Sequence, residues 1–190
     1  MVAELILFEL TNNKNITLKE ARKNLPKGCT PKDIPWIVRL LENPQSSFAL
    51  PGKITLYNHD CLHILLNRGF NLTDEAFVIG FTMGNDPKTN WFHLLIFKFF
   101  SRFIYPRDYR FNREHLKAFD LGVFWGKKII KKNINLIDFQ QYENKTVDEL
   151  RHILGFKTAS NSQQKKTIKV IDRSDRAFPV YLENFLLKSP

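Results

Sequence analysis

The side chains best suited to chemistry lie in one short stretch and at one position beyond it. The stretch reads His59-Asp60-Cys61-Leu62-His63, and eleven residues separate His63 from Glu75. Neutral imidazoles and carboxylates are good ligands for zinc and for non-haem iron. The sequence therefore predicts a metal site made by His59, Asp60, His63 and Glu75.

Two helices are needed to bring these residues together. The apolar spacing over residues 54–68 predicts the first helix, on which residues 59 and 63 lie about 40° apart and residue 60 about 100° from residue 59. Gly69 is expected to end that helix. Asn71 is expected to cap a second helix over about 74–84, which would fold back antiparallel and place Glu75 opposite the histidines.

Each residue also has an ordinary structural interpretation. A histidine on an apolar stripe is commonly a core residue with a hydrogen-bond partner, and Glu75 alone would be a carboxylate favoured by a helix N-terminus. Asp60 could be a surface acid, or could orient a histidine from outside the ligand set. Cys61 falls on the face opposite His59, which predicts packing rather than chemistry.

The rest of the chain predicts a mainly α, single-domain helical bundle over 1–190. Capping boxes open helices at Thr17 and Thr146, and Gly80 and Gly84 would let another backbone approach closely. A loop is expected at 159–166, followed by an arm over 167–190 that includes a short strand or extended segment. Further helices are expected at 17–25, about 33–42, 91–103, 112–132 and 146–154.

The pattern His-Asp-x-x-His-x11-Glu, read here from His59 to Glu75, resembles the metal-binding signature of the coenzyme Q biosynthesis protein four family. The helical order over about 30–155 is also similar. The resemblance implies a helical fold, a divalent metal, a bound polyprenyl lipid, and a role in oxidative decarboxylation of a prenylated hydroxybenzoate ring or in organising the enzymes of ubiquinone assembly. Asp74 stands where many members have glycine, and Leu62 where many have an aromatic residue.

The resemblance suggests a lipid-binding role for two further groups of residues. An aromatic-rich helix could hold an isoprenoid tail or lie on a membrane surface, although packing in the core is the simpler interpretation. Arginines that follow could bind a lipid phosphate or anionic headgroups, or could be plain surface charge. The aromatic and aliphatic residues are Trp91, Phe92, Leu95, Phe99 and Phe103, and the arginines are Arg102, Arg107, Arg110 and Arg113.

Composition and charge limit the class of protein and the compartment in which it is expected. Two cysteines in 190 residues exclude a disulfide framework, and no window is long and apolar enough for a transmembrane helix. The N-terminus resembles neither a signal nor a transit peptide, so we expect a cytoplasmic protein of bacterial type, peripheral on a membrane at most. Residues 1–95 hold 10 Lys/Arg and 9 Asp/Glu, whereas residues 96–190 hold 19 and 10, so the positive charge lies in the second half.

Several functions stay open at this point. The metal is expected to be zinc, with iron or magnesium as alternatives, and it could be catalytic or structural in a prenyl-lipid carrier or scaffold. A metal-dependent phosphohydrolase would need another histidine and another aspartate from distant helices. The basic half could contact nucleic acid, but no motif supports this and we expect no such partner. Other quinone-biosynthesis proteins or a second copy of the chain could be partners.

Overall fold

The computed structural model describes residues 15–25 and 34–156, which belong to one compact unit ending at Phe156. Within those residues the expected mainly α fold is confirmed, and the only β structure is an isolated bridge between Thr17 and Thr146. The expected loop at 159–166 and arm at 167–190 lie outside the described residues. The α-helices are α2 (Leu18–Lys23), α3 (Trp36–Glu42), α4 (Leu56–Leu66), α5 (Leu72–Asn85), α6 (Trp91–Phe99), α7 (Arg113–Lys128) and α8 (Val147–Leu154).

Most helices begin at a side-chain cap that can be predicted from the sequence. Thr17 and Thr146 form the expected capping boxes at the starts of α2 and α8. The Asn71 side chain accepts hydrogen bonds from the backbone N–H groups of Thr73 and Asp74, so α5 begins at Leu72. Each cap satisfies backbone donors that have no partner within the helix, which fixes where the helix begins.

One boundary each of α3 and α4 differs from the expected one for a local reason. Pro35 has φ −54° and ψ 144°, so α3 begins after it at Trp36 and not at Asp33. α4 ends at Leu66 and not at Gly69, because the next residue, Asn67, takes a left-handed conformation with φ 53° and ψ 53°. Asparagine is one of the few residues besides glycine that adopts this conformation readily.

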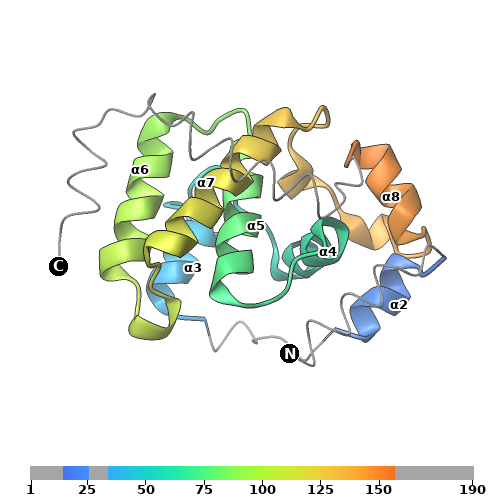
Figure 1. Ribbon diagram of the computed structural model, residues 1–190, viewed down its shortest axis with the longest axis horizontal. Helices are drawn as coiled ribbons and strands as arrows, with labels where there is room; N and C mark the ends of the chain where they lie inside the picture. The colour runs from blue at the N-terminus through green and yellow to red at the C-terminus, as the bar shows by residue number, and fades with distance from the viewer. Residues whose placement is uncertain (1–14, 26–33, 157–190) are drawn as a thin grey trace. The chain divides into compact units, whose positions relative to one another are not determined.

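The close approach expected at Gly80 and Gly84 occurs between α5 and α7 (Figure 1). A Cβ atom added at Gly80 would lie 2.1 Å from the carbonyl oxygen of Phe119, and one at Gly84 would lie 2.2 Å from that of Val123. Gly122 and Gly126 of α7 approach α5 as closely from the other side. These four glycines, called here the glycine seam, hold α5 against α7 backbone to backbone.

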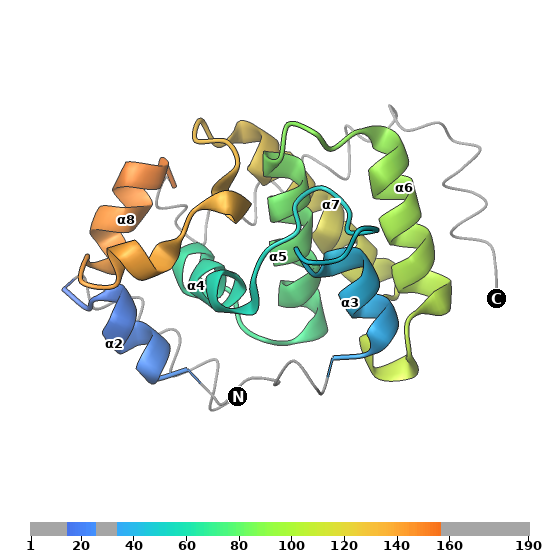
Figure 2. The same ribbon diagram turned by 180° about the vertical axis from the view of Figure 1, so that it is seen from behind.

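The buried core is mostly aromatic and aliphatic. One buried cluster joins α5, α6 and α7, and within it the rings of Phe97 and Phe119 stack with centroids 4.8 Å apart. A second cluster joins α3 to Tyr105, which follows α6, and Figure 2 shows α3 beside α5 and α6. Buried members of the first cluster include Ala76, Met83, Leu94, Phe97, Phe111, Leu116, Phe119 and Val123.

The segment after α6 is less regular than expected. The predicted helix over 91–103 is α-helical only to Phe99 and continues as one π-helical turn, Phe100–Ile104. The helix predicted over 112–132 ends at Lys128, and the ammonium group of Lys132 returns to donate hydrogen bonds to the carbonyls of Lys127 and Ile129 at 2.8 and 2.7 Å. The basic end of this segment therefore caps α7 without extending it.

Three contacts fix the position of α4, the helix that carries both histidines. Arg151 of α8 donates hydrogen bonds to the carbonyls of Ile64 and Leu65 at the C-terminal end of α4, at 3.0 and 2.9 Å. Near the other end, the Asn58 side chain donates to the carbonyl of Ile137. Both α2 and α8 pack against α4 (Figure 1). The helix is thus held at both ends by polar contacts.

Candidate metal centre

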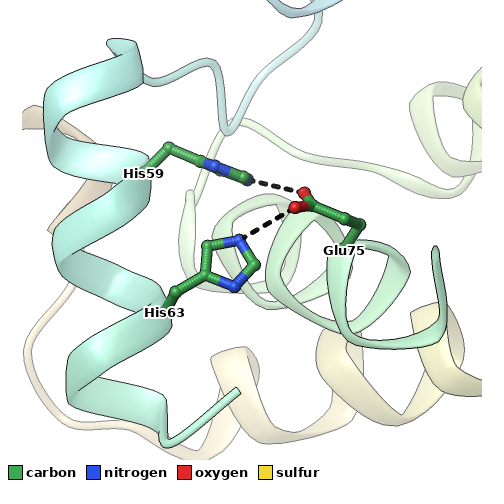
Figure 3. Close-up of side chains that lie close together, drawn as sticks. All are labelled: His59, His63 and Glu75. Atoms are coloured by element: carbon green, nitrogen blue, oxygen red, sulfur yellow. Dashed lines mark ion pairs between the residues drawn. The ribbon is translucent and has the colours of Figure 1, made fainter. Parts of the chain in front are cut away.

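The two helices that carry the site cross steeply. In Figure 3, α4 runs up the picture while the helix of Glu75 is seen nearly along its axis. The expected antiparallel arrangement is therefore wrong, because the chain turns at the left-handed Asn67 and starts α5 only five residues later. Glu75 nevertheless faces the histidines, since it lies in the first turn of α5, where the two helices cross.

His59, His63 and Glu75 form a compact triangle of ligand atoms. Nε2 of His59 lies 3.5 Å from Oε2 of Glu75, and Nε2 of His63 lies 3.5 Å from Oε1 (Figure 3). All three ligand atoms lie within 4.8 Å of one another. Two donors about 2.1 Å from a tetrahedral zinc ion are about 3.4 Å apart, so two of the separations already suit one ion. The three residues can hold a metal ion.

His63 has the hydrogen-bond pattern of a metal ligand. Its ring is fully buried and stacks on Phe70, with centroids 4.5 Å apart. Its Nδ1 lies 2.8 Å from the carbonyl oxygen of Gly69 and 3.3 Å from that of Arg68. Because a carbonyl can only accept, Nδ1 carries a hydrogen, and in the neutral ring Nε2 carries the lone pair. Nε2 is buried without a hydrogen-bond partner and is directed at Glu75.

Asp74 holds the turn whose carbonyls orient His63. Its carboxylate accepts hydrogen bonds from the backbone N–H of Gly69 at 3.0 Å and from the side chain of Asn71 at 2.9 Å. It also pairs with the guanidinium of Arg68 at 3.2 Å. From the sequence, Asp74 stood out only as a departure from the family pattern, and its role in positioning His63 was not predicted. Its place immediately before Glu75 was the only available signal.

The protonation of the three residues affects metal binding in opposite directions. Burial lowers the pKa of His59 to about 4, outweighing the attraction of Glu75, so this imidazole is neutral. Burial also opposes ionisation of Glu75, but the two histidines outweigh it and lower the pKa of that carboxyl. For His63, burial is outweighed by Glu75 and the two backbone carbonyls, so its pKa is raised. A proton held between His63 and Glu75 therefore competes with a metal ion.

Asp60, the fourth predicted ligand, does not join the triangle. Its carboxylate lies 3.8 Å from the guanidinium of Arg22 on α2. Burial raises its pKa, and the charges of Arg22 and His63 partly offset that effect. The reason is the 100° rotation between adjacent helix residues, which directs Asp60 toward α2 while His59 and His63 face α5. Cys61 is fully buried, as its predicted packing role requires.

A small cavity adjoins His59. Its wall includes Glu42 at the end of α3, Thr82 and Met83 of α5, and Phe97 of α6. The space open to the centre of a water molecule is about 30 Å³, which suits one or two water molecules rather than a prenyl chain. Glu42 was missed in the sequence analysis, because no spacing rule connects α3 to the histidine pair.

The residues proposed for a lipid tail lie mainly at the surface of α6. Trp91 is 65% exposed and Phe92 is 52% exposed, and Phe99 is also exposed. Leu95 and Phe103 are half-buried, and none of the five lines the cavity beside His59. The arrangement therefore offers aromatic surface on α6 and does not form a slot that reaches the metal triangle.

The four arginines proposed for a headgroup have different environments. Arg102 donates a hydrogen bond to the carbonyl of Phe111 at 3.1 Å, and Arg110 donates to that of Tyr105 at 3.2 Å. Arg107 and Arg113 have exposed side chains. Two of the four therefore brace the backbone around the π-helical turn.

Within residues 15–25 and 34–156, no helix is both long enough and apolar enough to span a bilayer. The helices that present the candidate ligands are short and end in polar caps. No protein-family model, curated protein or solved structure matches this chain.

Proposed function

We propose that the protein binds one divalent transition-metal ion through His59, His63 and Glu75. The observation that carries this proposal is the buried Nε2 of His63, which has a lone pair, no hydrogen-bond partner, and a carboxylate and a second imidazole beside it. Buried polar atoms are nearly always satisfied, so an open one that faces two other metal-binding side chains supports a bound ion. Donation of the other ring N–H to a backbone carbonyl is the usual support for a metal-bound histidine.

The donor set favours zinc or iron over magnesium. Two imidazoles and one carboxylate suit zinc and ferrous iron, whereas magnesium prefers oxygen ligands and keeps several waters. Structural zinc sites commonly have four protein ligands, while catalytic sites have three and keep a position open. Three protein ligands thus support a reactive centre, where a bound ion would supply Lewis acidity.

The test is the metal content of purified protein. Wild-type protein is loaded with zinc, desalted and analysed by elemental mass spectrometry. We expect one equivalent in wild type and less than a tenth of an equivalent in His63→Ala and Glu75→Gln. His152→Ala is the matched control, because His152 is exposed at the end of α8 and should leave the metal content unchanged. Circular dichroism checks that each variant folds, and equal zinc in folded wild type and His63→Ala would overturn the proposal.

We also propose a more specific role on the basis of the family resemblance. The protein would act on, or organise the processing of, a prenylated hydroxybenzoate ring in ubiquinone biosynthesis. The support is that three of the four positions of the motif are the three whose side chains converge. Single-turnover assays with a prenylated hydroxybenzoate and metal-loaded protein test this role. Decarboxylated product that is absent with His63→Ala would support it, and neither binding nor turnover of the compound would refute it.

A non-enzymatic lipid carrier is the second candidate, favoured by the exposed aromatic residues of α6. It predicts that the prenylated compound binds without turnover, and that Trp91→Ala weakens binding while leaving the metal in place. The phosphohydrolase alternative gains no support, because no further histidine or aspartate joins the triangle among the residues that the structure describes.

A further inference from the structure

The wall of the cavity beside His59 includes an acidic side chain, Glu42. The two residues come from different helices, α4 and α3, yet both line the same small space. Most of the remaining wall is apolar and includes Leu50, Ile79 and Phe97. The apolar wall offers the Glu42 carboxyl group few hydrogen-bond partners, so a molecule bound in the cavity can serve as one.

Tyr105 fixes the Glu42 carboxyl group from one side. The phenol donates a hydrogen bond to Oε1 of Glu42 at 2.7 Å, and Tyr105 itself is only 2% exposed. The π-helical turn places this phenol, because the Tyr105 backbone N–H bonds to the carbonyl of Phe100, five residues earlier. Single π-turns in helices are frequent at functional sites. The hydrogen bond occupies one carboxyl oxygen and leaves the other to carry a proton.

The charges around Glu42 set when it holds that proton. Burial raises its pKa to about 7, the Tyr105 hydrogen bond lowers it, and the negative charge of Glu75 raises it. The other titratable groups on the cavity wall are His59, which burial keeps neutral, and Lys53. Glu42 can therefore both hold and release a proton near neutral pH, as an acid–base residue must.

We propose that Glu42 exchanges a proton with a water molecule, or an oxygen acid of similar size, bound in the cavity beside His59. The inference rests on the proposed metal site, because an ion held by the triangle would give such a molecule its acidity. In the forward direction the O–H bond of the bound molecule breaks, its electron pair stays on that oxygen, and a new O–H bond forms on the Glu42 carboxylate. No electrons are transferred and no co-reactant is needed.

The test follows the Glu42 carboxyl group by NMR of protein labelled with ¹³C at glutamate side chains. Comparison with Glu42→Gln assigns the signal, which is titrated with and without one equivalent of zinc. We expect a midpoint near 7 without zinc and a fall of at least about one pH unit with zinc, because a nearby cation favours the carboxylate. Glu114, which is exposed on α7, is the internal control, and zinc should leave its signal unchanged.

Two variants separate this inference from the metal proposal. Tyr105→Phe should raise the Glu42 midpoint in the zinc-free protein, because the lost hydrogen bond had favoured the charged form. Glu42→Gln should still bind one equivalent of zinc, because all three ligands remain. If zinc binds and the Glu42 midpoint does not shift, the inference is wrong and the metal site stands. If wild-type protein binds no zinc, both fail.

Discussion

The two ends of α5 meet their neighbours in opposite ways. Toward its C-terminal end, Gly80 and Gly84 bring the helix into backbone contact with α7, with no space between the two. In its first turn, Glu75 extends a carboxylate toward two imidazoles 3.5 Å away, with no hydrogen bond closing the gap to His63. One end of the helix is packed to completion, and the other leaves room for an ion.

The buried polar residues at the two ends show the same difference. Asn85 donates hydrogen bonds to the carbonyls of Gly126 and Lys131 and accepts one from the backbone N–H of Ile134. His63 is equally buried, yet only one of its two ring nitrogens has a hydrogen-bond partner. Buried polar groups are usually satisfied within the protein. Among the described residues, Nε2 of His63 is the unsatisfied atom that has a carboxylate and a second imidazole beside it, as the proposed metal site requires.

The largest expected effect is at the glycine seam. Gly84→Ala places a Cβ atom 2.2 Å from a backbone oxygen of α7, so the two helices must separate, and we expect a loss of about 3 kcal/mol in unfolding free energy. Urea unfolding measures this loss. Gly155→Ala is the control, because Gly155 has φ +74° with nothing within 4 Å, and the strain alone should cost about 1 kcal/mol. Equal losses in both variants would contradict the seam.

Zinc should stabilise the protein only when the proposed ligands at the N-terminal end of α5 are intact. At a free zinc concentration one hundred times the dissociation constant, wild type should gain about 2.7 kcal/mol in unfolding free energy. His63→Ala should gain nothing at the same concentration. Asn85→Asp should start about 2 kcal/mol less stable, because a carboxylate cannot donate to the two carbonyls, and should then gain the full zinc increment. Stabilisation of His63→Ala by zinc would remove the distinction between the two ends.

Asp74 tests whether the orientation of His63 matters. Asp74→Ala frees the turn that contains Gly69, so the carbonyl that fixes the His63 ring loses its support. We expect zinc to bind about tenfold more weakly, the lower end of the range for residues that support a metal ligand. Calorimetric titration gives the affinity, and Glu114→Ala controls for removal of an acidic residue from the first turn of a helix. An unchanged affinity would show that the His63 ring is held by packing on Phe70 alone.

A change in pH should affect the end of α5 that carries Glu75 and not the end that carries Asn85. The raised pKa of His63 means that, without metal, its contribution to stability is complete below about 6.5 and disappears as pH rises through the folded-state value. Glu75, with a lowered pKa, contributes above about 4.5 and loses that contribution as pH falls through its folded-state value. Zinc affinity should instead rise with pH, at most tenfold per unit, until His63 has lost its proton. Titrations at several pH values measure both trends, and Asn85→Asp should leave the zinc trend unchanged.

The sequence predicted those helix boundaries that depend on a local side-chain contact. Thr17, Asn71 and Thr146 cap their helices within three residues of themselves, so the pattern is visible along the chain. The π-helical turn after Phe99 was not predictable in this way, because it depends on where Tyr105 finds its partner on α3. Boundaries set by tertiary contacts leave no local signal.

The site shows the same division. The spacing of His59 and His63 places them on one helix face whatever surrounds them, and the first-turn position of Glu75 brings it near them even though α5 crosses α4 instead of running antiparallel. Asp60 depended on what lay on the next face of α4, which is Arg22. Glu42 and its partner Tyr105 are 63 residues apart, so only the folded chain reveals the pair.

The glycine seam connects α7 to the proposed metal site. Gly122 and Gly126 lie within backbone contact of α5 and fix the helix that presents Glu75, although α7 supplies no ligand. In a screen for loss of zinc binding, we therefore expect substitutions at these two glycines to be recovered alongside those at the histidines. The positions at which substitution abolishes zinc binding would then include a helix that supplies no ligand.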